Sequence, residues 1–234
     1  MKLLALETAT EACSVALYVD GQVLERFELA PRRHAELTLP WAEQLLAEAG
    51  IARAQLDAIA LGRGPGAFTG VRLAIAIAQG IALALDRPLL PVSTLQTLAM
   101  RAPAEATQAL ASIDARMGEV YAARCVRDAE GVMQVQDNEV VIAPDAVHLP
   151  DDDSRWAGIG TGFAAADGLL AERLQSRLSS LDAQALPRAA DVLKIAVPAF
   201  MRGEGIAPEL VQPAYLRDNV ALTLVEQQAL RASR

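Results

Sequence analysis

The chain has 234 residues, 53% of them hydrophobic and 21% charged, which is enough apolar material for one large domain or two smaller lobes. This composition excludes an intrinsically disordered or fibrous protein. With 29 acidic and 21 basic side chains the net charge is −8, so the chain alone is a poor candidate for binding the phosphates of a nucleic acid.

Three strands are expected near the N-terminus. Apolar runs at residues 2–7 and 13–19 are separated by a polar turn. The pair Asp20-Gly21 is typical of a hairpin, and the chain returns through a third run at 23–29. The pattern therefore predicts three antiparallel strands.

Helices and strands alternate after these strands. Leu37, Trp41 and Leu45 recur every four positions, which predicts an amphipathic helix over residues 33–49. Pro40 lies in its early turns, so we expect this helix to start late or to kink. The next expected elements are a strand at 58–61, a helix at 71–85, a strand at 89–92 and a helix at 94–101.

The second half of the chain repeats this order of elements. Residues 111–121 give strand, polar turn and strand, as residues 4–14 do, and Glu7 and Asp114 each close the first strand. Such a repeat predicts two α/β lobes with mixed sheets. We expect the lobes to span residues 1–103 and 104–219, followed by a C-terminal tail at 220–234.

The sequence offers few residues for catalysis. Its two histidines, His34 and His148, have no second ligand at metal-binding spacing, so no metal site is predicted. Cys13 and Cys125 lie in apolar, strand-like runs and are expected to be buried, reduced thiols. The N-terminus lacks the features of a signal peptide, and the apolar run 71–85 is short for a membrane span, so we expect a cytoplasmic protein.

A glycine-rich turn connects a predicted strand to a predicted helix. It lacks the Gly-Lys-Ser/Thr ending of a phosphate-binding P-loop. Glycines permit positive φ angles and leave backbone N–H groups bare, so the turn could face an anion or a partner. The alternative is a tight connection that lets the helix pack closely on its strand, and both interpretations stay open. The candidate residues are Gly62, Gly64, Gly66 and Gly70.

Glu7 and Asp114 allow two interpretations as well. In phosphotransfer proteins with two such lobes, acids at strand ends hold Mg²⁺ or orient water near a nucleotide. The residues that follow Glu7, Thr8-Ala9-Thr10, do not form a tight phosphate loop. We therefore favour a solvated strand end at both positions.

The predicted helix at 71–85 is apolar almost all round. Ala76, Gly80 and Ala84 form a stripe of small residues on one face. The stripe is either buried under the first helix and the second lobe, or covered by helices of another chain. We favour the interface.

Several motifs together resemble the TsaB family, also called YeaZ. They lie at residues 3–17, 62–72, 92–95, 113–121 and 213–217. The resemblance implies the actin/Hsp70/sugar-kinase-like (ASKHA) fold, an α/β architecture of two RNase H-like lobes. It also implies the role of a non-catalytic scaffold subunit in the synthesis of N6-threonylcarbamoyladenosine at position 37 of tRNAs that read codons beginning with A.

The resemblance further implies partners. TsaB pairs with the transferase TsaD, with the ATPase TsaE in the ternary complex, and with itself when TsaD is absent. The tRNA is contacted only indirectly, no cofactor is bound by this chain alone, and ATP or ADP is expected at the interface of the complex. By similarity, the surface that pairs with TsaD combines the first two helices, with the candidate residues Leu37, Trp41, Leu45, Ala76, Gly80 and Ala84.

The transferase TsaD carries a His-x-x-x-His metal motif that this chain lacks. Alignment by similarity places Thr94 and Leu98 at the ligand positions, and neither replaces an imidazole. Glu7 stands where many relatives have Asp, which further disfavours nucleotide catalysis. Two other functions remain as alternatives, a stand-alone sugar-kinase-like ATPase and, less favoured, a peptidase.

Overall fold

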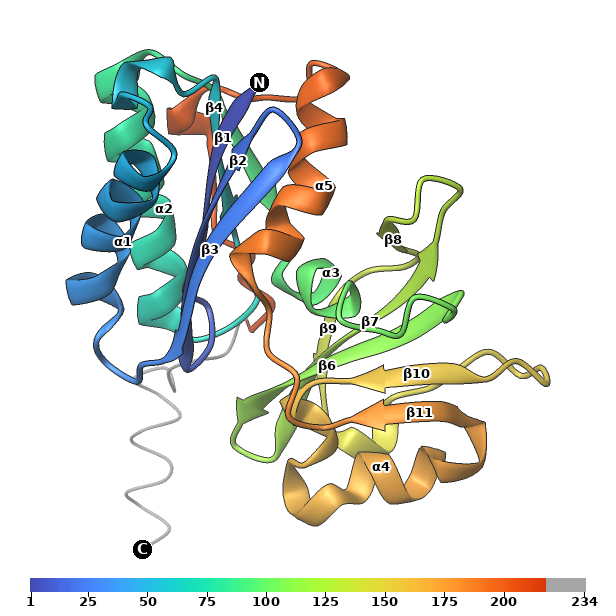
Figure 1. The fold of residues 1–234 in the computed structure, drawn as a ribbon. Helices are drawn as coiled ribbons and strands as arrows, with labels where there is room; N and C mark the ends of the chain where they lie inside the picture. Colours follow the sequence, from blue (N-terminus) through green and yellow to red (C-terminus); the bar gives the residue numbers. More distant parts are fainter. Residues whose placement is uncertain (218–234) are drawn as a thin grey trace, which may run out of the picture.

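The first sheet of the computed structural model has five strands in the order β3-β2-β1-β4-β5 (Figure 1). The structure describes residues 1–217, so the predicted tail at 220–234 lies outside the described residues. Strands β1, β2 and β3 form the expected antiparallel meander, and β4 and β5 continue parallel to β1. The strands span Lys2–Glu7 (β1), Ala12–Val19 (β2), Gln22–Leu29 (β3), Ala58–Gly62 (β4) and Leu89–Val92 (β5).

Helices cover both faces of this sheet. On one face lie α1 (His34–Glu48) and α2 (Phe68–Leu85), and on the other lies α5 (Ala189–Met201) (Figure 1). Large aliphatic side chains such as Leu6 and Ile59 fill the layer under α1 and α2. Small ones such as Ala5 dominate the layer under α5, so that helix packs close to the sheet.

The second sheet repeats the plan of the first. Its order is β11-β10-β6-β7-β8, with β9 paired to β7. Strands β6, β7 and β8 form an antiparallel meander, and β10 and β11 continue parallel to β6. The repeated pattern predicted from the sequence is therefore confirmed. The strands span Gln108–Arg116 (β6), Glu119–Arg127 (β7), Met133–Val135 (β8), Val140–Ile142 (β9), Trp156–Ile159 (β10) and Leu178–Asp182 (β11).

The lobes exchange the helix that follows the last strand of each sheet. Helix α3 (Thr94–Ala99) follows β5 but packs against β6, β7 and β8, and α5 follows β11 but packs against the first sheet. The predicted boundary between residues 103 and 104 is therefore wrong. The chain enters the second lobe at α3 and returns to the first after β11, because each helix finds its matching apolar layer on the other sheet.

Helix α2 is longer than expected, and α4 is short. Helix α2 begins at Phe68, three residues before the predicted start at 71, and so contains Gly70. Helix α4 spans only Leu169–Leu174, because the chain before it has left-handed φ values at Asp167 and Gly168. Short 3-10 helices complete the fold at Arg53–Gln55, Pro144–Ala146, Thr161–Phe163, Ala166–Gly168, Gln175–Arg177 and Pro208–Leu210.

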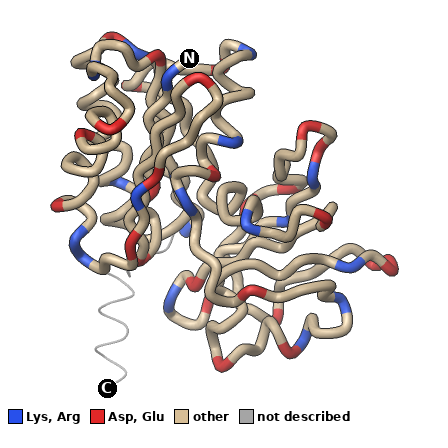
Figure 2. The backbone as a smooth tube through the Cα atoms, in the orientation of Figure 1, with Lys and Arg blue, Asp and Glu red and all other residues tan. Residues whose placement is uncertain are grey.

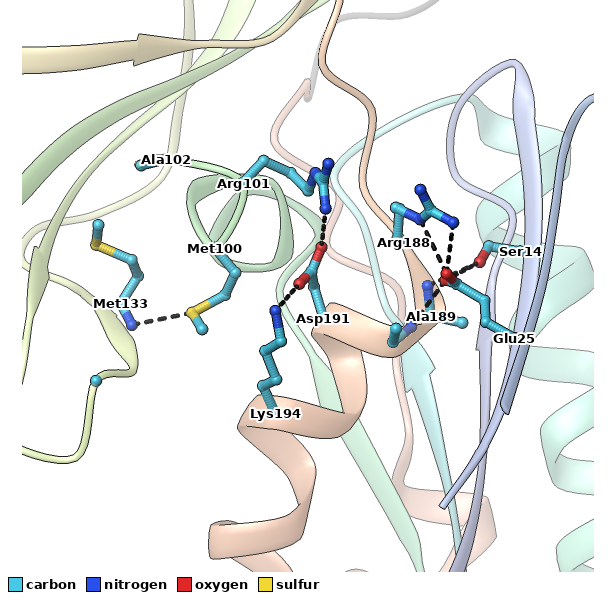
Figure 3. A network of polar contacts seen from close by, with 12 residues as sticks. Ser14, Glu25, Met100, Arg101, Ala102, Met133, Arg188, Ala189, Asp191 and Lys194 are labelled. Atoms are coloured by element: carbon cyan, nitrogen blue, oxygen red, sulfur yellow. Dashed lines mark hydrogen bonds and ion pairs between the residues drawn. The ribbon is translucent and has the colours of Figure 1, made fainter. Parts of the chain in front are cut away.

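A polar network fixes α5 to the first sheet (Figure 3). The carboxylate of Glu25 on β3 accepts hydrogen bonds from Arg188 Nε (3.0 Å) and Nη2 (2.6 Å), and from the Ser14 hydroxyl (2.8 Å). It also accepts the backbone N–H of Ala190 in the first turn of α5, at 3.0 Å. One carboxylate thus accepts hydrogen bonds from a free backbone N–H in the first turn of α5 and from the guanidinium of Arg188.

Replacing Glu25 by glutamine should weaken the attachment of α5. The amide keeps the shape of the side chain but removes the negative charge that compensates Arg188, which is only partly exposed. We expect the free energy of unfolding to fall by about 2 to 3 kcal/mol, measured by urea denaturation. Glu204→Gln, on an exposed ion pair with Arg202, serves as control and should change little. Equal stabilities of the two variants would contradict this role of Glu25.

Candidate functional site

The outward side of α2 is exposed and made largely of small or apolar residues. Ala76, Gly80 and Ala84 face solvent, while the opposite side of the helix is buried on the first sheet. A Cβ atom added at Gly80 would meet no atom within 4 Å. The small-residue stripe is thus open in the isolated chain, so the alternative that it is buried under the first helix and the second lobe is wrong. We call the exposed residues Phe68, Arg72, Ala76, Gly80, Leu83 and Ala84 the outer face of α2.

Helix α1 contributes less to such a surface than its periodicity suggested. Leu37 and Trp41 are half-buried at its edge, whereas Leu45 is fully buried in the core of the first lobe. Leu45 is therefore wrong as a candidate interface residue. Each step of four residues turns the side chain by about 40° around a helix axis, so a four-residue series drifts from the edge into the core.

The glycine-rich turn packs against the segment that follows β1. A Cβ atom at Gly62 would lie 2.0 Å from Glu7 Oε2, one at Gly66 2.3 Å from the carbonyl oxygen of Ala9, and one at Gly70 2.0 Å from that of Thr8. These glycines permit a close approach of the chain to itself. The contacts therefore support the tight-connection interpretation.

Gly64 belongs to the same turn and adopts a backbone conformation with positive φ, which favours glycine. Its φ is +93°, and its N–H donates to the hydroxyl of Thr94 at 3.2 Å. The N–H of Ala67 donates to the carbonyl of Ala9 at 2.7 Å. Two backbone donors of the turn are thus engaged within the chain.

Glu7 is buried, contrary to the expectation of a solvated strand end. Its side chain fills the space that Gly62 leaves, and its residue is 1% exposed. The carboxylate accepts the N–H of Ala9 at 2.8 Å and the hydroxyl of Thr94 at 3.4 Å. Burial raises the pKa of Glu7 to about 7, because charging a carboxyl group away from water is costly.

Asp114 stays at the surface, as expected. Its carboxylate accepts the backbone N–H of Arg116 at 2.8 Å and Nη1 of the same residue at 2.9 Å. The two acids at equivalent strand ends therefore have different environments.

The two positions that the resemblance aligns with the metal ligands of the transferase, Thr94 and Leu98, hold no metal-binding side chain. The hydroxyl of Thr94 is occupied by Gly64 and Glu7, and Leu98 is fully buried in the second lobe. Within residues 1–217 no group of three His, Cys, Asp or Glu side chains comes together. The residues present do not fit a metal centre of that kind.

The two cysteines are buried as predicted, one in each lobe. Burial raises the pKa of Cys125 to about 12 and also raises that of Cys13. Both side chains are therefore thiols at neutral pH and poor nucleophiles.

Helix α2 is longer than the run 71–85 considered from the sequence. Within residues 1–217 it is the one helix whose length and composition would allow a membrane span. One of its sides, which includes Ala74 and Ala78, packs on the first sheet as a core helix does.

Sequence reasoning missed a cluster at the start of the outer face of α2. The guanidinium carbon of Arg72 lies 3.6 Å from the ring centre of Phe68, and its Nε donates to the hydroxyl of Tyr215 at 2.6 Å. Phe68 is 59% and Tyr215 51% exposed, unusual for such large rings. No local pattern could reveal this group, since Tyr215 lies 143 residues after Arg72.

The repeated sheet order and the exchanged helices define an α/β protein of two RNase H-like lobes, the ASKHA fold. The family model "TsaD: tRNA N6-adenosine threonylcarbamoyltransferase" matches residues 27–224. TsaB of Escherichia coli K12 is 46% identical over 94% of this chain and 96% of its own length, and TsaB of Haemophilus influenzae is 38% identical over 94% and 95%. The chain belongs to the TsaB (YeaZ) family.

A solved structure agrees with this identification. That of YeaZ from Pseudomonas aeruginosa is 48% identical and superposes with a TM-score of 0.85, covering 92% of this chain and 99% of that one. The resemblance found in the motifs and the fold it implied are both confirmed.

Proposed function

We propose that this chain is the non-catalytic partner of the transferase TsaD in the synthesis of N6-threonylcarbamoyladenosine at position 37 of tRNA. The observation that carries the proposal is the outer face of α2. Three small residues on it leave room for another helix, and the face has no cover within the described residues. The names of the relatives, tRNA threonylcarbamoyladenosine biosynthesis proteins, support the same pathway.

The environments of Glu7, Thr94 and Leu98 support an accessory role. The chain matches the family model of the transferase along most of its length, yet the resemblance places Thr94 and Leu98 at the positions of the metal ligands. Glu7 is enclosed by Gly62 and Thr94 and has no solvent-facing oxygen to offer to Mg²⁺ or water. Catalysis in the complex therefore belongs to the partner.

The rest of the proposed assembly is what the resemblance to the TsaB family implies. TsaE joins the pair, ATP or ADP binds at the interface of the complex, and two copies of the chain pair when TsaD is absent. Acidic and basic residues alternate over both lobes in Figure 2, and the net charge is −8, so the tRNA is held mainly by the partner. A tRNA-modifying complex works in the cytoplasm, where we place the chain.

An omission series tests this proposal. Purified chain, TsaD and TsaE of the same organism are mixed with unmodified tRNA, ATP and threonylcarbamoyl adenylate, and the modified nucleoside is quantified by mass spectrometry. We expect none from the chain alone, at most a trace from TsaD with TsaE, and full product from all three. The chain alone should also hold less than about 0.1 equivalent of Zn or Fe by elemental analysis, because its donor set does not fit a metal.

Two results would contradict the proposal. Product formed at full rate without the chain would show that it is not a required subunit. Steady ATP hydrolysis by the isolated chain would favour the stand-alone ATPase, and peptide cleavage would favour the peptidase.

A further inference from the structure

Arg72 is held in a fixed position on the outer face of α2. Its guanidinium lies over the ring of Phe68 at 3.6 Å and 5.5 Å from the ring centre of Tyr215, while Nε donates to the Tyr215 hydroxyl at 2.6 Å. Stacking and one hydrogen bond thus limit the rotation of an exposed side chain. Less conformational entropy remains to be lost when a ligand binds it.

The two Nη groups of Arg72 remain available. Within residues 1–217 they have no hydrogen-bond acceptor, and Arg72 forms no ion pair. Arg63, Arg116 and Arg217, around the neighbouring turns, do have carboxylate partners. A planar pair of N–H donors matches the two oxygens of a carboxylate or a phosphate.

Arg72 lies on the same side of α2 as the small-residue stripe. Phe68, Arg72, Ala76 and Gly80 lie at intervals of four residues, so each is next to the following one on the helix surface, and all four are exposed. A helix packed on the stripe would extend over Arg72. Interface energy concentrates in a few anchored side chains, with arginine and tyrosine among the most frequent.

The segment that carries Tyr215 is attached to both lobes. Tyr215 belongs to the segment 213–217, in which the N–H of Ala214 donates to the carbonyl of Arg63 at 2.8 Å. Arg217, two residues on, forms an ion pair with Glu119 on β7. The position of the Tyr215 hydroxyl, and with it that of Arg72, is therefore determined by both lobes.

We propose that Arg72, held between Phe68 and Tyr215, anchors the partner interface by binding a carboxylate of the partner protein. A carboxylate is favoured over a tRNA phosphate because the adjoining surface is made of small apolar residues and the chain carries a net charge of −8. The inference rests on the proposed pairing with TsaD through the outer face of α2.

Three variants of the full-length chain test the anchor. The dissociation constant for TsaD is measured by isothermal titration calorimetry for Arg72→Ala, Arg72→Lys and Tyr215→Phe, with Arg202→Ala as an exposed control on the far side of the first lobe. We expect Arg72→Ala to bind on the order of 30-fold more weakly. Arg72→Lys should bind nearly as weakly, because a lysine keeps the charge but loses the planar pair of donors.

Tyr215→Phe separates positioning from charge. It leaves Arg72 in place and removes only the hydroxyl that fixes Nε, so we expect a loss of about threefold to tenfold. Arg202→Ala should bind as the wild type does. All four variants should melt within about 2 °C of the wild type, because the altered groups are exposed.

The outcomes distinguish the anchor from the interface. If Arg72→Ala paired normally with TsaD and Gly80→Leu did not, the anchoring role of Arg72 would be wrong, while the proposed interface on the outer face of α2 would stand. Normal pairing by both variants would overturn the proposed interface itself. If Arg72→Ala pairs normally but the complex binds tRNA more weakly in a filter-binding assay, Arg72 serves a phosphate and the carboxylate proposal is wrong.

Discussion

Replacing Gly80 by leucine is expected to abolish pairing with TsaD while the isolated chain stays folded. Gly80 lies at the centre of the small-residue stripe, and no atom stands within 4 Å of its absent Cβ. A leucine therefore fits the monomer, and replacing a glycine in an exposed helix interior gains about 0.5 to 1 kcal/mol. The melting temperature should be equal to or slightly above that of the wild type.

The same leucine should prevent close packing of a partner helix. Small residues allow two helix axes to approach within about 8 Å, the low end of the usual range, and an added isobutyl group forces them apart. Overpacking a tight contact costs about 1 to 3 kcal/mol per site, and removing the surrounding contacts adds to that. We expect affinity to fall at least about 100-fold, measured by co-elution and by calorimetry.

Two further substitutions on α2 calibrate this result. Gly80→Ala adds one methyl group and should weaken pairing only in part. Ala78→Leu adds the same volume on the opposite side, where Ala78 is fully buried, and should destabilise the monomer. If Gly80→Leu unfolded as Ala78→Leu is expected to, the small-residue stripe would belong to the buried core of the monomer. If Gly80→Leu folded and still co-eluted with TsaD, the interface with TsaD would lie elsewhere on the chain.

Glu7 should make the protein less stable as the pH rises from about 5 to 8. The pKa of Glu7 is raised from 4.5 to about 7 in the folded chain, so the folded state holds a proton that the unfolded state releases. The stability gained from this proton is complete below pH 4.5 and is lost as the pH rises through 7. A shift of this size corresponds to about 3 kcal/mol.

Glu7→Gln should remove this dependence. The glutamine carbonyl can accept the N–H of Ala9 as the carboxylate does, and the side chain stays neutral at every pH. Chemical denaturation at pH 5 and pH 8 should show a smaller decrease for the variant, which becomes the more stable protein at pH 8. Subtracting the two profiles isolates Glu7 from the other acids. Parallel profiles would show that Glu7 is not buried in its protonated form.

Most secondary structure could be predicted from the sequence because it depends on neighbouring residues. The meander of β1 to β3, the amphipathic α1 and the long apolar α2 all follow from periods of two or about 3.6 residues. The repeat of this order revealed the second lobe, and the motifs between Leu3 and Arg217 identified the family. The outward direction of Gly80 was also foreseen, since a helix on a sheet buries one side only.

The tertiary structure decided which surfaces are shared. Periodicity shows that α3 and α5 each have an apolar side, but only the packing of the whole chain places each helix on the other lobe's sheet. Leu45 and Glu7 became buried for the same reason, because the core closes around them from distant segments.

The Arg72 cluster depends on tertiary structure alone. Phe68 and Arg72 are neighbours on one helix, but Tyr215 reaches them only after the chain has built the second lobe and returned. Local sequence fixes the direction of each side chain on its own element, since φ and ψ repeat along it. Contacts between elements far apart in the chain arise from the burial of shared apolar surface, which no short stretch of sequence encodes.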